Sequence, residues 1–182
     1  MSAFGLGCMR LPTQRLRIQK IDVPLAVDLI QRAVENGINY FDTAWPYHFG
    51  ESERVAGDAL KDGLRKRGHL VSKLPMFVVR KESDFDRFLN RQLEKLKTDY
   101  LDTYLFHGLN AGGFEKVKRL DLMAKMLRAR DDGRIRHVGF SFHDTLPVFK
   151  SIVDYYNWDV VQIQYNYMDS GIQATTENSD SQ

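Results

Sequence analysis

The sequence is poor in cysteine and has no long apolar run. Its single cysteine, Cys8, excludes an intramolecular disulfide and a cysteine-rich metal cluster, and no metal site is predicted. No stretch approaches the roughly 20 apolar residues that a membrane-spanning helix needs. The first residues, MSAFGLGCMRLP, lack the basic and apolar regions of a secretory signal. We therefore predict a protein of the reducing cytoplasm that does not enter a membrane.

The sequence also lacks an excess of charge of either sign. It has 26 Lys and Arg against 24 Asp and Glu, a formal net charge of +2. This balance gives no electrostatic basis for binding nucleic acid or an anionic membrane, and neither partner is predicted. With 182 residues, 43% of them hydrophobic, the chain is long enough for one domain with a buried core.

Short apolar runs of β type recur at intervals of about thirty residues, the length of a βα unit. The six runs are Phe4–Met9, Ile38–Asp42, His69–Lys73, Leu101–His107, Arg136–Ser141 and Val160–Tyr165.

Helical spacing of apolar residues fills the intervals between these runs. Pro24 suits the first turn of a helix, and Gly37 can end it. Further helices are predicted after a capping pair of Ser83 and Asp86, through Val117–Leu127 and through Leu146–Val153. Alternating strands and helices indicate an α/β fold with a parallel sheet and right-handed crossovers.

Two features favour a barrel over a doubly wound sheet. The sequence GLGCMR after the first run does not match the phosphate-binding pattern G-x-G-x-x-G. A polar residue lies at or near the C-terminal end of most of these runs. In a barrel, the C-terminal ends of the strands converge on one axis. These polar residues are Asp42, Lys73, His107, Ser141 and Gln162.

The predicted fold is therefore a (β/α)8 TIM barrel that is incomplete, with about six βα units present. A closed barrel of this type has eight strands, and six runs are visible. We assign residues 1–177 to this partial barrel. Residues 178–182 belong to a Ser- and Asp-rich end, and we expect them to form a disordered tail.

Four of the strand-end groups suit the reduction of a carbonyl by hydride. The oxygen needs an acid, and a tyrosine such as Tyr47 serves if a nearby ammonium favours its phenolate. The ammonium of Lys73 would need a carboxylate such as Asp42, and a neutral His107 could hold the carbonyl. Taken singly, the same residues are also typical of a helix cap, loop packing, a surface lysine and a core histidine.

The stretch Tyr40–Leu60 (YFDTAWPYHFGESERVAGDAL) resembles the signature of the aldo-keto reductase superfamily. In that family an Asp is followed five residues later by the catalytic Tyr and then by a Gly-x-Ser-Glu segment that opens a helix. Lys73 in VSKLP and His107 in YLFHG match the family's strand-end Lys and substrate-orienting His. The resemblance implies that Asp42, Tyr47, Lys73 and His107 are catalytic.

The same resemblance implies a cofactor, NADPH or NADH. Ser141 and Gln162 fall where the family binds the nicotinamide carboxamide, and Cys8 and Met9 fall where the chain passes the nicotinamide ribose. Asp42 is also assigned to cofactor binding. The sequence GFSFHD is similar to a microbial branch that often adds a cysteine-rich iron–sulfur tail.

The predicted function is reduction of an aldehyde or ketone to an alcohol by hydride transfer from NADPH, with Tyr47 as general acid and a small carbonyl compound as substrate. Aromatic residues in the loop, Trp45 and Phe49 with His48, suit an apolar or aromatic substrate. Two alternatives stay open: a cofactor-sensing or regulatory subunit with little turnover, and an inactive truncated remnant. Open barrel edges also predict self-association.

Overall fold

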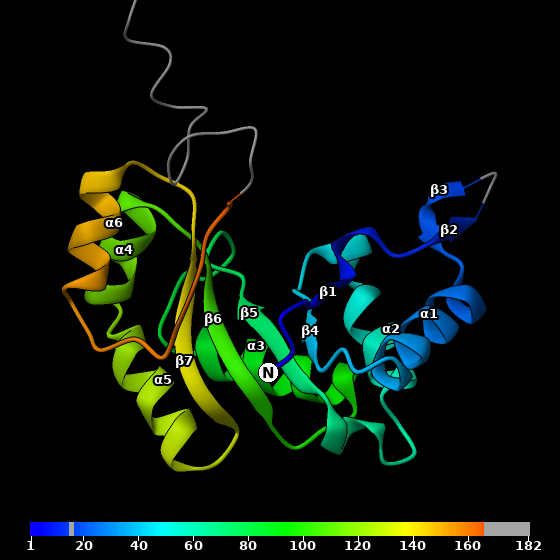
Figure 1. The fold of residues 1–182 in the computed structure, drawn as a ribbon. Coiled ribbons are helices and arrows are strands. Elements are labelled where there is room, and N and C mark those ends of the chain that lie inside the picture. Colours follow the sequence, from blue (N-terminus) through cyan, green and yellow to red (C-terminus); the bar gives the residue numbers. More distant parts are fainter. Residues whose placement is uncertain (15–16, 166–182) are drawn as a thin grey trace, which may run out of the picture.

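The computed structural model describes residues 1–14 and 17–165, and all six predicted strands are found there. They form one sheet in the order β1-β4-β5-β6-β7-β8, in which every neighbouring pair is parallel (Figure 1). The strands are β1 Leu6–Gly7, β4 Tyr40–Asp42, β5 His69–Leu74, β6 Leu101–Leu109, β7 Ile135–Phe142 and β8 Val160–Gln162.

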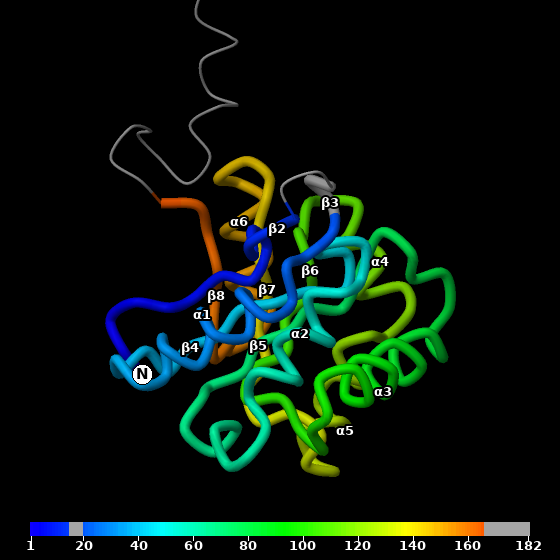
Figure 2. Tube along the Cα trace, turned by 90° about the vertical axis from the view of Figure 1, so that its right-hand side faces the viewer, coloured from blue at the N-terminus to red at the C-terminus, as the bar shows by residue number. Residues whose placement is uncertain are grey.

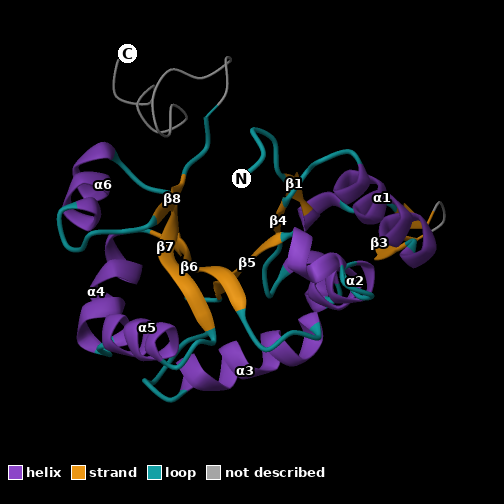
Figure 3. Ribbon diagram, turned by 60° about the horizontal axis from the view of Figure 1, so that its bottom comes forward, coloured by secondary structure: helices purple, strands orange, loops and turns teal. Residues whose placement is uncertain are grey.

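The sheet curls into an arc with helices on its outer face (Figure 3). The helices are α1 Val23–Glu35, α2 Ser52–Ala59, α3 Asp84–Leu96, α4 Ala111–Arg119, α5 Leu122–Asp131 and α6 Leu146–Val153. The predicted incomplete (β/α)8 barrel is confirmed as a six-stranded half-barrel, with β1 and β8 as its two edges. The predicted tail, residues 178–182, lies outside the described residues.

A two-stranded antiparallel ribbon, β2 (Thr13–Gln14) and β3 (Arg17–Ile21), precedes α1 and was not predicted. Figure 2 shows it at the same end of the molecule as α6. The first predicted strand is also shorter than expected, because Cys8–Arg10 turns into a 3-10 helix directly after β1.

Local signals explain where α1 begins and ends. The Asp22 carboxylate accepts a hydrogen bond from the backbone N–H of Leu25, and Pro24 occupies the first turn. Gly37 follows the helix with a φ of 87°, a conformation that a residue without a side chain adopts without strain. Both predicted limits of this helix are confirmed.

The helix predicted after Ser83 is found as α3, but two details of the helix predictions are wrong. Ser83 makes no capping hydrogen bond; the Asp84 carboxylate instead accepts the backbone N–H groups of Arg80 and Lys81. The bond from Arg80, together with the Arg87 guanidinium and the weaker effect of the Lys81 bond, lowers the pKa of Asp84 to about 2. The single helix predicted through Val117–Leu127 is two helices, α4 and α5, because Asp121 between them takes a left-handed conformation with φ 49°.

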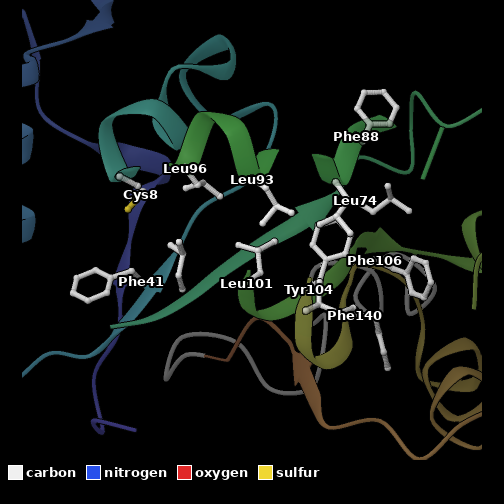
Figure 4. Packing of buried hydrophobic residues seen from close by; sticks show 14 of the residues in the cluster. Cys8, Phe41, Leu74, Phe88, Leu93, Leu96, Leu101, Tyr104, Phe106 and Phe140 are labelled. Carbon is white, nitrogen blue, oxygen red and sulfur yellow. The ribbon is translucent and has the colours of Figure 1, made fainter. Parts of the chain in front are cut away.

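The core lies between the outer face of the sheet and the helices, and Figure 4 shows part of it. Phe41 of β4, Leu74 of β5, Phe106 of β6 and Phe140 of β7 are completely buried. Burying side chains of this size contributes about 1.5–3 kcal/mol each relative to exposure. No helix in the described part of the chain is long and apolar enough to cross a membrane.

Helices α2 and α3 approach each other closely at Gly57. A Cβ atom at this position would lie 2.7 Å from the backbone carbon of Leu96 and 2.8 Å from the backbone oxygens of Leu96 and Lys95. Backbone atoms cannot move aside as a flexible side chain can. The missing side chain at Gly57 therefore sets the distance between α2 and α3.

We expect Gly57→Ala to lower the free energy of unfolding by about 1–3 kcal/mol, because the added methyl overpacks the α2–α3 contact. Urea denaturation followed by circular dichroism measures the change. Gly112→Ala is the control, since a Cβ there would meet its nearest atom, Asn110 Oδ1, at an ordinary 3.7 Å. Equal stability of the two variants would contradict the close-packing argument.

Candidate active site

The strand ends bring the predicted polar residues to one end of the arc. Asp42 is the last residue of β4 and pairs in register with Val71 of β5, two residues before Lys73. Ser141 of β7 and Gln162 of β8 are direct register partners. Because the strands are parallel and neighbouring, residues far apart in the sequence meet at the same edge.

Lys73 is the centre of this group. Its Nζ atom donates hydrogen bonds to Asp42 Oδ1 at 2.7 Å and Oδ2 at 2.8 Å, to the Thr43 backbone oxygen at 3.1 Å and to Tyr47 Oη at 3.1 Å. Lys73 is 1% exposed, and Asp42 is 8% exposed. A buried ammonium persists only when it is paired and hydrogen-bonded, and this arrangement meets both needs.

A tight turn places Tyr47 over Lys73. Residues Tyr47–Gly50 form a 3-10 turn in which His48 and Phe49 have positive φ angles of 49° and 56°. Below the turn, Ser52 Oγ donates to the Cys8 backbone oxygen at 2.8 Å and lies 2.9 Å from Thr43 Oγ1. These bonds tie the loop after β4 to the start of α2.

His107 stands on the other side of Tyr47, with the two ring centroids 5.9 Å apart at an interplanar angle of 83°. Burial, together with the charge of Lys73 and the proximity of His143, lowers the pKa of His107 to about 4. The imidazole is therefore neutral at physiological pH. Its Nδ1 atom is buried and has no hydrogen-bond partner among the described residues.

These side chains line a cavity of about 190 Å³. Its wall includes Tyr47, Lys73, His107, Ser141 and Gln162, so five of the residues selected from the sequence meet around one space. Asp42 is not part of the wall and lies behind Lys73.

Two groups in this wall fit a primary carboxamide, which presents one acceptor and two donors. Ser141 Oγ accepts the backbone N–H of Gly108 at 2.8 Å, which leaves its own hydrogen available to donate. Gln162 Oε1 is a buried acceptor without a partner among the described residues. The pair matches the nicotinamide amide in both donor and acceptor.

Cys8 and Met9 differ in their surroundings. Cys8 is completely buried, and burial, with a smaller effect of the Asp42 charge, raises the pKa of its thiol to about 12. The thiol is therefore protonated and not a nucleophile. Met9 is 56% exposed. Neither residue lines the cavity, and their predicted contact with the cofactor ribose stays a prediction.

The other ring-bearing residues of this loop, Trp45, His48 and Phe49, do not line the cavity either. Trp45 packs edge-on against Phe88 and lies under Lys95 Nζ, and His48 Nε2 accepts the backbone N–H of Leu11. Phe49 is 78% exposed. An apolar or aromatic substrate therefore stays a prediction from the sequence.

The sequence reasoning did not select four residues of this site. The Thr43 backbone oxygen accepts from Lys73, and His143, Ile163 and Gln164 line the cavity. Their proximity to Asp42, Ser141 and Gln162 in the sequence was the available signal.

A family model described as "Aldo/keto reductase family" matches residues 3–178. An Escherichia coli (strain K12) protein named NADH-specific methylglyoxal reductase is 26% identical over 190 residues, which cover 95% of this chain and 58% of the relative. The chain thus spans little more than half of that protein.

Solved structures give the same result. The holo form of an aldo-keto reductase from Bacillus halodurans matches with a TM-score of 0.73 and 27% identity, covering 89% of this chain and 53% of that one. An aldo/keto reductase from Klebsiella pneumoniae in complex with NADP and acetate matches with a TM-score of 0.71 and 27% identity, covering 91% and 55%.

We expect the His107 imidazole to titrate near pH 4, as followed by its carbon-bound proton resonances. Because this pKa lies below the ordinary 6.5, the unfolded chain takes up the proton first as the pH falls. The folded state therefore loses stability between about pH 6.5 and pH 4, and His107→Gln removes this part of the pH dependence. A His107 midpoint near 6.5 would contradict the buried, neutral imidazole.

Proposed function

This chain belongs to the aldo/keto reductase family, and on that premise we propose that it provides the acid–base site for reducing an aldehyde or ketone to an alcohol. The observation that carries the proposal is the buried contact of Lys73 Nζ with Tyr47 Oη at 3.1 Å, backed by the Asp42 carboxylate. A phenol beside a fixed ammonium is arranged to release its proton.

In the proposed reaction the substrate carbonyl oxygen lies between Tyr47 and His107. Tyr47 Oη donates its proton to this oxygen as negative charge builds there, and the Lys73 ammonium stabilises the phenolate that remains. Asp42 holds Lys73 in its charged form and in one orientation. Neutral His107 donates a hydrogen bond that positions the carbonyl.

NADPH, or NADH, is the proposed hydride donor, and Ser141 and Gln162 would hold its carboxamide. When bound, the nicotinamide supplies the hydride. The Klebsiella pneumoniae protein is in complex with NADP, and the Escherichia coli relative is named as NADH-specific, so the family supports both forms. Contacts with the cofactor phosphates are expected from the loops after the seventh and eighth strands of a barrel, and these strands are not among the six described.

The proposed substrate is a small carbonyl compound. The cavity of about 190 Å³ is small, and the Escherichia coli relative is named for methylglyoxal. A cytoplasmic location stays a prediction from the sequence.

Tyr47→Phe tests the role of the general acid. We expect kcat to fall by about 10²–10⁴-fold, the usual contribution of a positioned acid, while the affinity for NADPH changes little. Stopped-flow measurement of NADPH oxidation with a panel of small aldehydes gives kcat, and NADPH fluorescence gives the affinity.

Phe49→Leu is the control, since Phe49 is exposed and lies in the same turn without lining the cavity. Equal loss of turnover and of cofactor binding in Tyr47→Phe would indicate a structural role for this tyrosine. NADPH binding without turnover by the unaltered chain would favour a cofactor-sensing subunit.

Self-association is proposed through the open barrel edges. Among the described residues, strands β1 and β8 are each paired on one side only, and unpaired strand edges favour association. Apolar side chains are exposed beside β8, with Val161 and Ile163 36% exposed and Tyr165 90% exposed. Together they provide both backbone groups and apolar surface for a second copy.

We expect sedimentation velocity to show a dimer whose fraction falls in Val161→Lys, because a charge on the edge strand opposes pairing. Leu25→Lys, at an exposed position on α1, is the matched control and should leave the dimer unchanged. A monomer at all concentrations up to the millimolar range would rule out this association.

A further inference from the structure

A polar cluster lies behind Lys73, on the outer face of β5. It consists of Glu53 from α2, Ser72 from β5, Gln92 from α3 and Tyr104 from β6, and we call it the Gln92 cluster. All four side chains are completely buried. Ser72 faces this cluster while the next residue, Lys73, faces the cavity, as alternation along a strand requires.

Gln92 connects every member of the cluster. Its Nε2 atom donates to Glu53 Oε1 at 2.5 Å and lies 2.8 Å from Ser72 Oγ and 3.1 Å from the Lys73 backbone oxygen. Its Oε1 atom accepts from the Tyr104 hydroxyl at 2.6 Å. The amide therefore reaches the backbone of the lysine on which the candidate site depends.

The cluster reaches the other side of the site through Lys95, one turn after Gln92 on α3. Lys95 Nζ donates to Glu53 Oε2 at 3.2 Å and to the Gly50 backbone oxygen at 3.0 Å. Gly50 ends the turn that begins with Tyr47. The backbones that carry Lys73 and Tyr47 are thus both bonded to one helix.

Burying such a polar cluster costs free energy of folding. A completely buried carboxylate must be compensated by several donors, and apolar packing of the same volume is often more stable. Glu53 receives bonds from Ser72, Gln92 and Lys95. Apolar side chains cannot provide the direction that these bonds have. The bonds of Gln92 and Lys95 hold β5, β6 and the Tyr47 turn against α3.

We propose that Gln92 is a positioning residue that holds the Lys73 strand end and thereby keeps the Lys73 ammonium within hydrogen-bond distance of Tyr47. The role in catalysis rests on the proposed function, whereas the geometry can be tested without turnover. A displacement of about 1 Å in such a contact can lower the rate by as much as 10²-fold.

Gln92→Met tests this inference, since it keeps the length of the side chain and removes its hydrogen bonds. The first readout is the nitrogen-bound proton signal of the Lys73 ammonium, which slow exchange in its buried bonds makes visible, assigned by its loss in Lys73→Met. We expect it to shift or broaden beyond detection in Gln92→Met. The second readout is kcat, which we expect to fall about tenfold with KM changed less than about twofold.

Two controls separate positioning from stability. Leu93→Ala, next to Gln92 and buried in the core, should lower stability while keeping the ammonium signal and kcat measured well below the unfolding temperature. Tyr104→Phe removes only the bond to Gln92 Oε1 and keeps the bonds of Gln92 Nε2, including the one to the Lys73 backbone oxygen, so it should have a smaller effect than Gln92→Met.

An unchanged ammonium signal in Gln92→Met, or the same loss of signal in Leu93→Ala, would overturn the inference. Absence of turnover in the unaltered protein would count against the proposed function alone, since the ammonium signal still decides whether Gln92 positions Lys73.

Discussion

A buried ammonium is the constraint around which this site is arranged. Lys73 sits almost entirely out of water, and its charge is stable there only because Asp42 presents both carboxylate oxygens to it. The two residues come from neighbouring strands and are 31 positions apart. Strands β4 and β5 must therefore lie side by side in one register before the ion pair can exist.

The parallel half-barrel provides that register and adds the remaining groups. Successive strands end at the same edge, so His107 and Ser141 follow Lys73 around the curve of the sheet. The curvature turns a row of strand ends into the wall of a cavity. A flat sheet with the same sequence order would leave these groups along a line.

The two faces of β5 have different roles: one faces the cavity, and the other packs against α3. Lys73 faces the cavity, and Ser72 faces the buried interior, where it bonds to Glu53 of α2 and Gln92 of α3. Directional bonds behind the strand restrain the backbone in a way that apolar contacts do not, because dispersion contacts tolerate sliding. Helix α3 is in contact with both the Lys73 strand and the Tyr47 turn.

The amino-acid sequence alone determined the strands and their polar ends. Apolar runs at regular intervals, with Asp42, Lys73 and His107 at run ends, reflect local propensity and spacing, which a linear sequence carries directly. The limits of α1 followed from Pro24 and Gly37 in the same way, whereas the Asp22 cap was found only in the structure.

Only the tertiary structure decided which of the other residues face the site. It turned Trp45 towards Phe88, buried Glu53 against Gln92 39 positions away, and split α4 from α5 at Asp121. These outcomes depend on packing between segments distant in the sequence, and local periodicity contains no information about such contacts. The chemistry of the site was readable in the sequence, whereas its support and the shape of its cavity came from the fold.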